Sequence, residues 1–224
     1  MNKRAVMPSS PAQSLTDLAY AHLEELIVTL KLAPGAVVSE AELSELTGIG
    51  RTPIREALQR LAREKLVSIL PRRGIVVSEI NVGSQLRLLE VRRELERLIA
   101  RTAARRATAE EREEFREIAK RFEKSARSDD DVAFMRTDRE FNSLCSAASH
   151  NDFAASAMGL MHSLSRRFWY IHYRQAADMP LTAKLHADIA RAIADADQER
   201  AARASDRLLD EIEKFTRETV SGDG

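Results

Sequence analysis

Residues 48–74, GIGRTPIREALQRLAREKLVSILPRRG, decide the fold that we predict for the start of this chain. The segment opens with a helix that runs from about Arg51 to about Lys65. Its apolar residues recur at helical spacing and comprise Ile54, Ala57, Leu58, Leu61 and Ala62. Pro53 falls in the first turn, where a missing N–H costs nothing. The β-branched runs LVSIL and GIVVSEI follow on either side of PRRG, which predicts a two-stranded hairpin with a basic tip.

Two helices precede this segment. Apolar residues spaced by three and four over residues 15–30 predict the first. Ser39 and Glu42 have the spacing of a capping box, which predicts a short second helix over residues 41–46. The order helix, helix, turn, helix and hairpin is that of a winged helix-turn-helix.

The rest of the chain has the pattern of consecutive helices. We predict them at about residues 85–106, 109–126, 131–149, 152–175, 182–195 and 198–219. The fold class is therefore mainly α, an N-terminal winged helix-turn-helix followed by an all-α bundle of about six helices. The predicted parts are a flexible N-terminal arm (1–13), the winged helix-turn-helix (14–78), a linker (79–84) and the bundle (85–220).

Composition restricts the classes of protein that remain. The chain has 224 residues, 44% of them hydrophobic, and carries 35 basic and 35 acidic side chains. Its single cysteine, Cys145, cannot form an internal disulfide and lies in an apolar helical pattern, so we expect a buried thiol and a reducing compartment. No apolar run approaches the roughly 20 residues that span a bilayer, so we expect a cytoplasmic protein.

The predicted third helix concentrates positive charge. Residues 48–74 contain seven Lys or Arg and two Glu, although the whole chain is formally neutral. A DNA major groove accepts one helix and is read by side chains near its N-terminus, with Arg on guanine as the commonest contact. The hydroxyl of Thr52 and the free N–H groups of the first turn could hold a phosphate. The predicted DNA-binding residues are Arg51, Thr52, Pro53, Arg55, Gln59, Arg72, Arg73 and Gly74.

A second interpretation of the same segment stays open. Winged helices also serve as protein docking modules, in which case the arginines are solvated and contact no DNA. The concentration of charge on one face favours the DNA interpretation.

Residues 42–77, ELSELTGIGRTPIREALQRLAREKLVSILPRRGIVV, resemble the DNA-binding domain of the GntR family of bacterial transcription regulators. The segments LLEVRRELE, DREFN and LHADIARAIADADQERAARA resemble the FCD effector domain of the FadR-type subfamily, in its six-helix, VanR-like group. The resemblance implies a homodimeric, effector-controlled regulator, most often a repressor, that binds a palindromic operator with Arg51 and Arg55 reading bases. Two positions depart from the family pattern, Gly50 where Ser or Thr is usual and Ala41 where relatives carry a DNA-contacting Arg.

The resemblance also implies a divalent metal site, because many FCD domains hold a metal with one Asp and three His. The matching positions here are Asp138, Asn142, His186 and Leu208, so two of the four side chains cannot act as the family ligands do. Asp138, Asn142 and His186 therefore form an incomplete site. Either water or an effector completes it around a metal ion, or the pocket is polar and metal-free, or Asp138 and His186 are simply a buried hydrogen-bonded pair.

Effector contacts are expected in the same domain. Arginines interleaved with aromatic residues in MHSLSRRFWYIHYRQ could clamp a carboxylate within an amphipathic wall. The candidate effector-binding residues are Arg92, Asp138, Arg139, Asn142, Arg167, Tyr170 and His186. FCD relatives respond to small organic acids or sugar acids, so the resemblance implies a ligand of that class.

A metal-dependent enzyme is the competing hypothesis for the bundle. Asp138, Asn142 and His186 would hold the ion, and Glu140 or Asp188 would act as base. No nucleophile stands out in the sequence, and we expect no catalytic activity.

Overall fold

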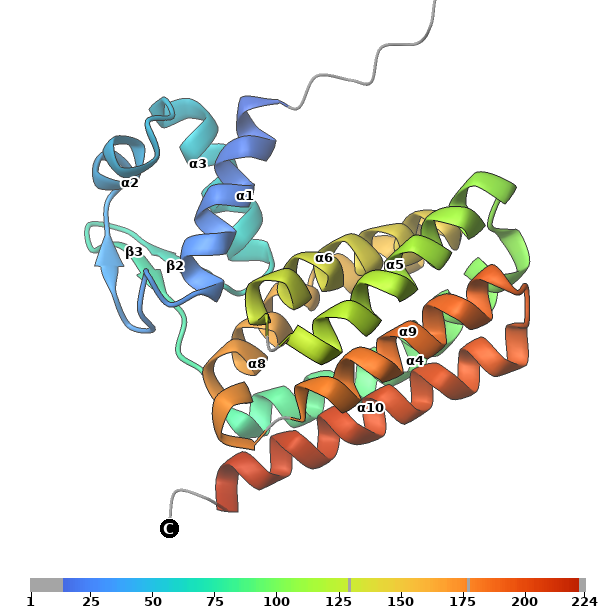
Figure 1. Cartoon of the computed structure of the whole chain (residues 1–224). Helices are drawn as coiled ribbons and strands as arrows, with labels where there is room; N and C mark the ends of the chain where they lie inside the picture. The colour runs from blue at the N-terminus through green and yellow to red at the C-terminus, as the bar shows by residue number, and fades with distance from the viewer. Residues whose placement is uncertain (1–13, 129, 177, 222–224) are drawn as a thin grey trace, which may run out of the picture. The chain divides into compact units, whose positions relative to one another are not determined.

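The computed structural model describes residues 14–128, 130–176 and 178–221, which fall into two compact units that divide between Glu79 and Ile80. Figure 1 shows their elements, most of them labelled. The predicted N-terminal arm at residues 1–13 lies outside the described residues. Within the described residues no helix is both long enough and apolar enough to cross a membrane.

The first unit is a winged helix-turn-helix, as predicted. Its elements are α1 (Leu15–Val28), β1 (Val37–Val38), α2 (Glu40–Thr47), α3 (Arg51–Arg63), β2 (Val67–Leu70) and β3 (Gly74–Val77). The predicted hairpin is part of a three-stranded antiparallel sheet in the order β1-β3-β2. Strand β1 is absent from the prediction, because a strand of two residues is too short to show an alternating pattern.

Local signals determine where α2 and α3 begin and end. Both halves of the predicted capping box are present, since Ser39 accepts from the N–H of Glu42 and Glu42 accepts from the N–H of Ser39. Gly48 ends α2 in the left-handed region, with φ of 69°. Gly50 precedes α3 and provides no side-chain cap. The apolar side of α3 is buried by packing on α1 and α2, through Ile54, Ala57, Leu58 and Leu61.

The second unit is a bundle of seven described helices. They are α4 (Val82–Arg106), α5 (Ala109–Ser128), α6 (Asp131–Ala148), α7 (Asp152–Gly159), α8 (His162–Ala176), α9 (Met179–Ala194) and α10 (Gln198–Ser221). In this unit α9 packs on both α5 and α10, and α10 also packs along α4 (Figure 1). Ten of the sixteen residues of α9 are buried, among them a series of alanines at positions 183, 187, 190 and 194. Such small side chains allow neighbouring helices to approach closely on several sides.

Three predicted boundaries in this unit were wrong. The predicted helix at 152–175 is two helices, α7 and α8, because the chain breaks at Leu160–Met161. Helix α4 begins at Val82, inside the predicted linker, because the side chain of Asn81 caps it by accepting from the N–H of Ser84. Helix α9 begins at Met179 with Asp178 as its cap, which places Pro180 in the first turn.

Packing within the three-stranded sheet requires glycine at position 74. Gly74 has φ of 95°, and a Cβ placed on it would lie 2.9 Å from the carbonyl oxygen of Val38 in β1. Gly48 has a similar φ of 69° but nothing within 4 Å of the same position. The two glycines therefore share a backbone requirement, and Gly74 has a steric one in addition.

We predict that Gly74→Ala destabilises the first unit more than Gly48→Ala does. Both variants meet the left-handed penalty of about 1–2 kcal/mol for a residue with a Cβ. Gly74→Ala adds an overlap with backbone that costs about 1–3 kcal/mol more. Urea denaturation of the full chain, followed by circular dichroism, measures the difference. Equal losses in the two variants would show that β1 moves aside without cost.

Candidate functional site

The polar side of α3 is presented to solvent. Arg51, Thr52, Arg55 and Gln59 are exposed, whereas Pro53 is half-buried in the first turn. Because no side chain caps the helix at Gly50, the N–H groups of this first turn have no side-chain acceptor at that position. Free first-turn N–H groups and nearby basic side chains form an arrangement that binds phosphate.

Arg55 is held by a carboxylate from the neighbouring helix. Its Nε donates to Glu40 Oε1 at 2.9 Å, and its terminal nitrogen donates to Glu40 Oε2 at 2.7 Å. This two-pronged hydrogen bond lowers the pKa of Glu40, so the carboxylate is ionised at neutral pH. The Arg55 guanidinium is thus oriented before any ligand binds, and DNA has to compete with Glu40 or share Arg55 with it.

The wing carries the other predicted DNA contacts. Arg72 and Arg73 are both exposed in the turn between β2 and β3, and Arg72 has a positive φ of 64°. Gly74 follows as the first residue of β3, where it lies against β1. Gly74 is predicted to contact DNA, but its close approach to the Val38 carbonyl in β1 is enough to require glycine there without DNA.

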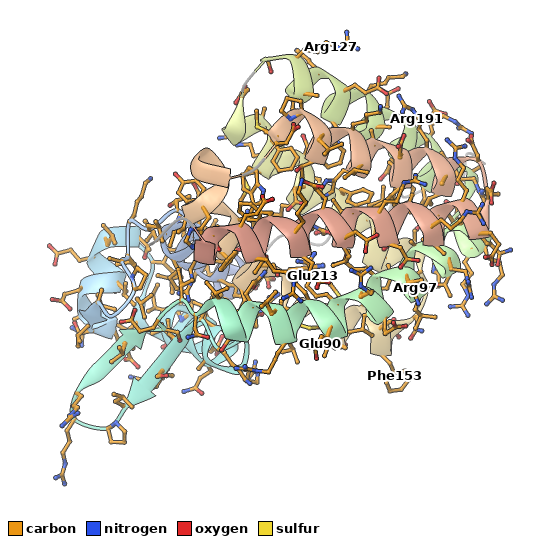
Figure 2. All side chains as sticks on the ribbon, turned by 90° about the horizontal axis from the view of Figure 1, so that it is seen from below. Glu90, Arg97, Arg127, Phe153, Arg191 and Glu213 are labelled. Atoms are coloured by element: carbon orange, nitrogen blue, oxygen red, sulfur yellow. The ribbon has the colours of Figure 1, made fainter. Side chains whose placement is uncertain are left out.

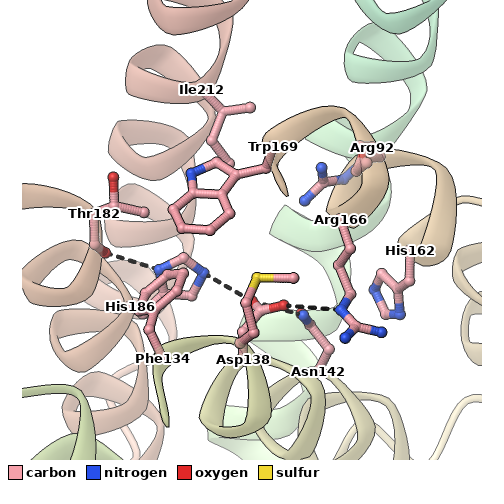
Figure 3. A pocket seen from close by; sticks show the side chains of 12 residues that line it. Arg92, Phe134, Asp138, Asn142, His162, Arg166, Trp169, Thr182, His186 and Ile212 are labelled. Carbon is pink, nitrogen blue, oxygen red and sulfur yellow. Dashed lines mark hydrogen bonds and ion pairs between the residues drawn. The ribbon is translucent and has the colours of Figure 1, made fainter. Parts of the chain in front are cut away.

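A small cavity lies inside the second unit, among α4, α6, α8, α9 and α10 (Figure 3). It has a volume of about 50 Å³. The lining residues are Arg92, Phe134, Met135, Asp138, Asn142, His162, Ser165, Arg166, Trp169, Thr182, His186 and Ile212. Polar groups thus meet aromatic and aliphatic walls, as is usual in a ligand pocket.

Asp138 is the hub of the polar contacts. Its Oδ1 accepts from Asn142 Nδ2 at 3.0 Å and lies 3.3 Å from His186 Nε2, while its Oδ2 lies 3.8 Å from Arg166 Nε (Figure 3). Burial alone would raise the pKa of Asp138, but the contacts with His186 and Arg166 outweigh burial and lower it. Asp138 is therefore a buried carboxylate that is ionised at neutral pH.

His186 is oriented by its own helix. Its Nδ1 lies 2.8 Å from the carbonyl oxygen of Thr182, one turn earlier. A carbonyl oxygen only accepts, so Nδ1 carries a proton and Nε2 is the atom directed at Asp138. The Phe122 ring, 4.9 Å from the imidazole centroid, covers one side of it.

Two further basic groups reach the cavity. Arg92 Nε donates to Glu96 Oε1 at 2.6 Å, and its side chain is 8% exposed. The pKa of His162 is lowered, first by burial and then by the positive charge of Arg92, so this imidazole is neutral at neutral pH. Arg92 and Arg166 therefore each bring a guanidinium group to the wall, and Arg92 is paired there with Glu96.

The structure brings together four of the seven candidate effector residues, namely Arg92, Asp138, Asn142 and His186. The other three lie outside the cavity lining. Arg139 is exposed on α6, Arg167 is buried at 2% exposure, and Tyr170 is half-buried on α8.

Three lining residues that bear on function, His162, Arg166 and Trp169, are absent from the candidate effector residues, although they lie in the segment MHSLSRRFWYIHYRQ that supplies Arg167 and Tyr170. Together with Ser165 they follow the spacing i, i+3, i+4, i+7 along α8, so they form a single helix face. Positions 167 and 170 belong to other faces. Helical spacing counted from His162 would have found the correct set, whereas the density of Arg and aromatic residues did not.

The donor set does not fit the metal site that the FCD resemblance implies. Asn142 directs its amide N–H at Asp138, and Leu208 is a hydrocarbon in the hydrophobic core. Arg166 places a positive charge beside the single carboxylate. Among the described residues, no group of three or more His, Cys, Asp or Glu is arranged to hold a metal ion.

The residues of the competing enzyme hypothesis do not converge. Glu140 is exposed and pairs with Arg121, and Asp188 lies near Arg191 and Arg207, so neither lines the cavity. Cys145 is buried as expected, and burial, followed by the nearby negative charges, raises its pKa well above the usual value. A protonated, inaccessible thiol is a poor nucleophile.

Comparison with known proteins agrees with both units. Residues 15–77 match the family model described as bacterial regulatory proteins, gntR family, and residues 87–211 match that of the FCD domain. The HTH-type transcriptional repressor RspR of Escherichia coli is 26% identical over 93% of this chain and 92% of its own length. An HTH-type transcriptional regulator in an unstable DNA locus of Streptomyces ambofaciens is 47% identical over 62 residues, covering 28% of this chain and 26% of that protein.

A solved structure shares the fold along nearly the whole chain. Escherichia coli McbR/YncC superposes with a TM-score of 0.79 at 19% identity, covering 92% of this chain and 99% of that one.

The contact between Glu40 and Arg55 yields a prediction. Glu40→Gln removes the charge that holds Arg55, so Arg55 becomes available to a phosphate. We expect binding of a random-sequence duplex to gain salt dependence, with the slope of log K against log salt steeper by about 0.9. Fluorescence anisotropy at several salt concentrations measures it. The control is Glu45→Gln, an equal charge change at another exposed position of α2. The same slope in both variants would mean that general charge, and not Arg55, is responsible.

Proposed function

The chain belongs to the gntR family of bacterial regulatory proteins and carries an FCD domain; we propose that it is a repressor that binds a palindromic operator as a homodimer and is controlled by a small-molecule effector in the bundle. It is a DNA-binding transcription regulator and not an enzyme. Its use as a protein docking module is not favoured. We place its action in the cytoplasm, because its DNA target lies there.

The proposal that the protein binds DNA rests on one observation: α3 has a buried apolar side and an exposed basic side. One side is buried, and the opposite side exposes Arg51, Arg55 and Gln59 from a helix whose first turn has no side-chain cap. We assign base contacts to Arg51 and Arg55, since Arg is the residue that most often reads guanine. Thr52, Pro53, Arg72, Arg73 and Gly74 are assigned to the phosphate and wing contacts.

The cavity in the bundle supports the effector part. Arg92, Asp138, Asn142 and His186 line it from three different helices, so a ligand there would touch several elements at once. An effector can shift DNA affinity only by as much as it prefers one conformation over another. A site shared by α4, α6 and α9 is suited to such a preference, because movement between these helices changes its shape.

Selection from genomic DNA tests the function. We expect the protein to enrich one palindromic element, and Arg51→Ala to lose that enrichment, because loss of one bidentate base contact costs about 1–3 kcal/mol. The matched control is Arg63→Ala, which removes the same charge from the last turn of α3. Sequencing of the retained fragments is the measurement. Equal enrichment by the parent protein and Arg51→Ala would contradict the assignment, and no enrichment by any of the three would contradict the function.

An exposed apolar face supports the proposed homodimer. Helices α4 and α7 pack together, and α4 carries two exposed apolar side chains seven residues apart, whereas α7 carries one. Val91 and Leu98 of α4 are 52% and 42% exposed, and Phe153 of α7 is 90% exposed. Figure 2 shows the Phe153 side chain pointing away from the bundle. Arg97 and Glu94, which pair with each other within one copy, flank this face with opposite charges that two copies related by a two-fold axis can also bring together.

We predict that Phe153→Asp weakens the dimer. A central aromatic side chain contributes about 2 kcal/mol or more to an interface, so the dissociation constant should rise by roughly 30-fold or more. Sedimentation velocity over a concentration series measures the change. Leu46→Asp, at another exposed leucine outside the bundle, is the control and should leave the dimer intact. An unchanged dimer in Phe153→Asp would assign the interface to another face.

A further inference from the structure

A positively charged side chain of the protein itself lies in the cavity of the bundle. In the family pattern a metal ion supplies positive charge beside the aspartate, whereas here Arg166 Nε lies 3.8 Å from Asp138 Oδ2. The two side chains are only 16% and 11% exposed, so little water screens the pair. The charge that the family obtains from a metal is thus provided by a side chain of α8.

We propose that this pocket works without a metal ion and that the guanidinium of Arg166, with that of Arg92, receives the carboxylate of a small monocarboxylate effector. This inference rests on the proposed effector role of the cavity and specifies its ligand. It makes Asp138 a residue that positions Arg166, instead of a metal ligand.

The oxygens of Asp138 are already engaged. Oδ1 accepts from Asn142 and faces His186, and Oδ2 faces Arg166. A dication would have to displace these protein contacts and approach within about 2.0–2.6 Å of the same oxygens. It would also come close to the Arg166 guanidinium inside a poorly screened cavity, which is electrostatically unfavourable.

The missing donors cannot be replaced from nearby side chains. Leu208 is 2% exposed in the hydrophobic core and offers no lone pair. Asn142 uses its N–H on Asp138, and its amide oxygen is a neutral and weaker ligand than the family imidazole. Asp138 and His186 are then two ligands where a structural or catalytic zinc site has at least three from the protein.

Two arginines on the cavity wall can receive a carboxylate. Arg92 and Arg166 are each already paired with one protein carboxylate, Glu96 and Asp138 respectively, so a ligand carboxylate has to share these arginines with the protein. Arginine binds carboxylates through two parallel N–H bonds, which gives orientation as well as affinity. His162, kept neutral by burial, can donate one further hydrogen bond without adding charge.

Size and polarity restrict the rest of the ligand. A volume of about 50 Å³ corresponds to a few water molecules, so the part of the ligand that enters the cavity has few non-hydrogen atoms. Phe134, Trp169 and Ile212 form the apolar side of the cavity. A carboxylate attached to a short carbon chain satisfies both sides, whereas a dicarboxylate would bring a second charge against these apolar side chains.

The metal half of the proposal is tested on the unmodified protein. Elemental analysis of the purified chain should find far less than one zinc, nickel or manganese ion per chain, and calorimetric titration with zinc should show no stoichiometric binding. The variant Asn142→His/Leu208→His restores the family's donor set and should gain one zinc per chain. Stoichiometric zinc in the unmodified protein would overturn this half.

The ligand half is tested by thermal unfolding with acetate, propanoate, lactate and pyruvate as probes and propanamide as the uncharged analogue. We expect at least one monocarboxylate to raise Tm by about 2–4 °C or more at saturating concentration, and propanamide to leave it unchanged. Arg166→Gln should abolish the rise, and Arg166→Lys, which keeps the charge but not the two-pronged geometry, should reduce it. Arg139→Gln, outside the cavity, is the control.

Three outcomes would overturn the ligand half. They are an equal rise in Arg166→Gln, a rise only after a metal is added, and no rise with any of the four monocarboxylates. None of them affects the enrichment of DNA by the parent protein, so failure of this inference is distinguishable from failure of the proposed function.

Discussion

Burial of the apolar side of α3 is the constraint on which the first unit depends. Ile54 and Leu61 are fully buried and Leu58 is 2% exposed, and α3 packs on α1 and α2. A helix that buries residues at this spacing must present the intervening positions to solvent. The outward placement of Arg51 and Arg55 is therefore a consequence of core packing, and it holds whether or not DNA is present.

Burial also determines which side chains of the bundle need polar partners. Helix α9 is buried on nearly every side, and its alanines leave room for α5 and α10 to pack against it. His186 is one of its few polar residues, so it has to satisfy its nitrogens locally, through the Thr182 carbonyl and Asp138. The polar cavity exists because a buried helix carries an imidazole that requires partners.

Much of the fold was predictable from sequence because its signals are local. Helical periodicity and caps such as Ser39 with Glu42, or Thr108 with Glu111, act over three or four residues, and the structure contains both capping boxes. Strand β1 depends on pairing with the distant strand β3, through Val37 with Val76 and Val38 with Ile75, which no local pattern reveals. The pocket was partly predictable for the same reason: Asp138 and Asn142 share one helix face, whereas Arg166 reaches Asp138 only through packing of α8 on the bundle.

Gly74 has a consequence for how related chains are interpreted. Its place in the wing is required by the carbonyl of Val38, so natural selection for a folded sheet is enough to retain glycine there. A descendant that had lost its operator would keep this residue for as long as it kept its sheet. Retention of the wing glycine therefore indicates only that the sheet still folds. The sheet does not need exposed residues such as Arg72 and Arg73, so substitutions at these positions are the better sign that a lineage has changed or abandoned its DNA target.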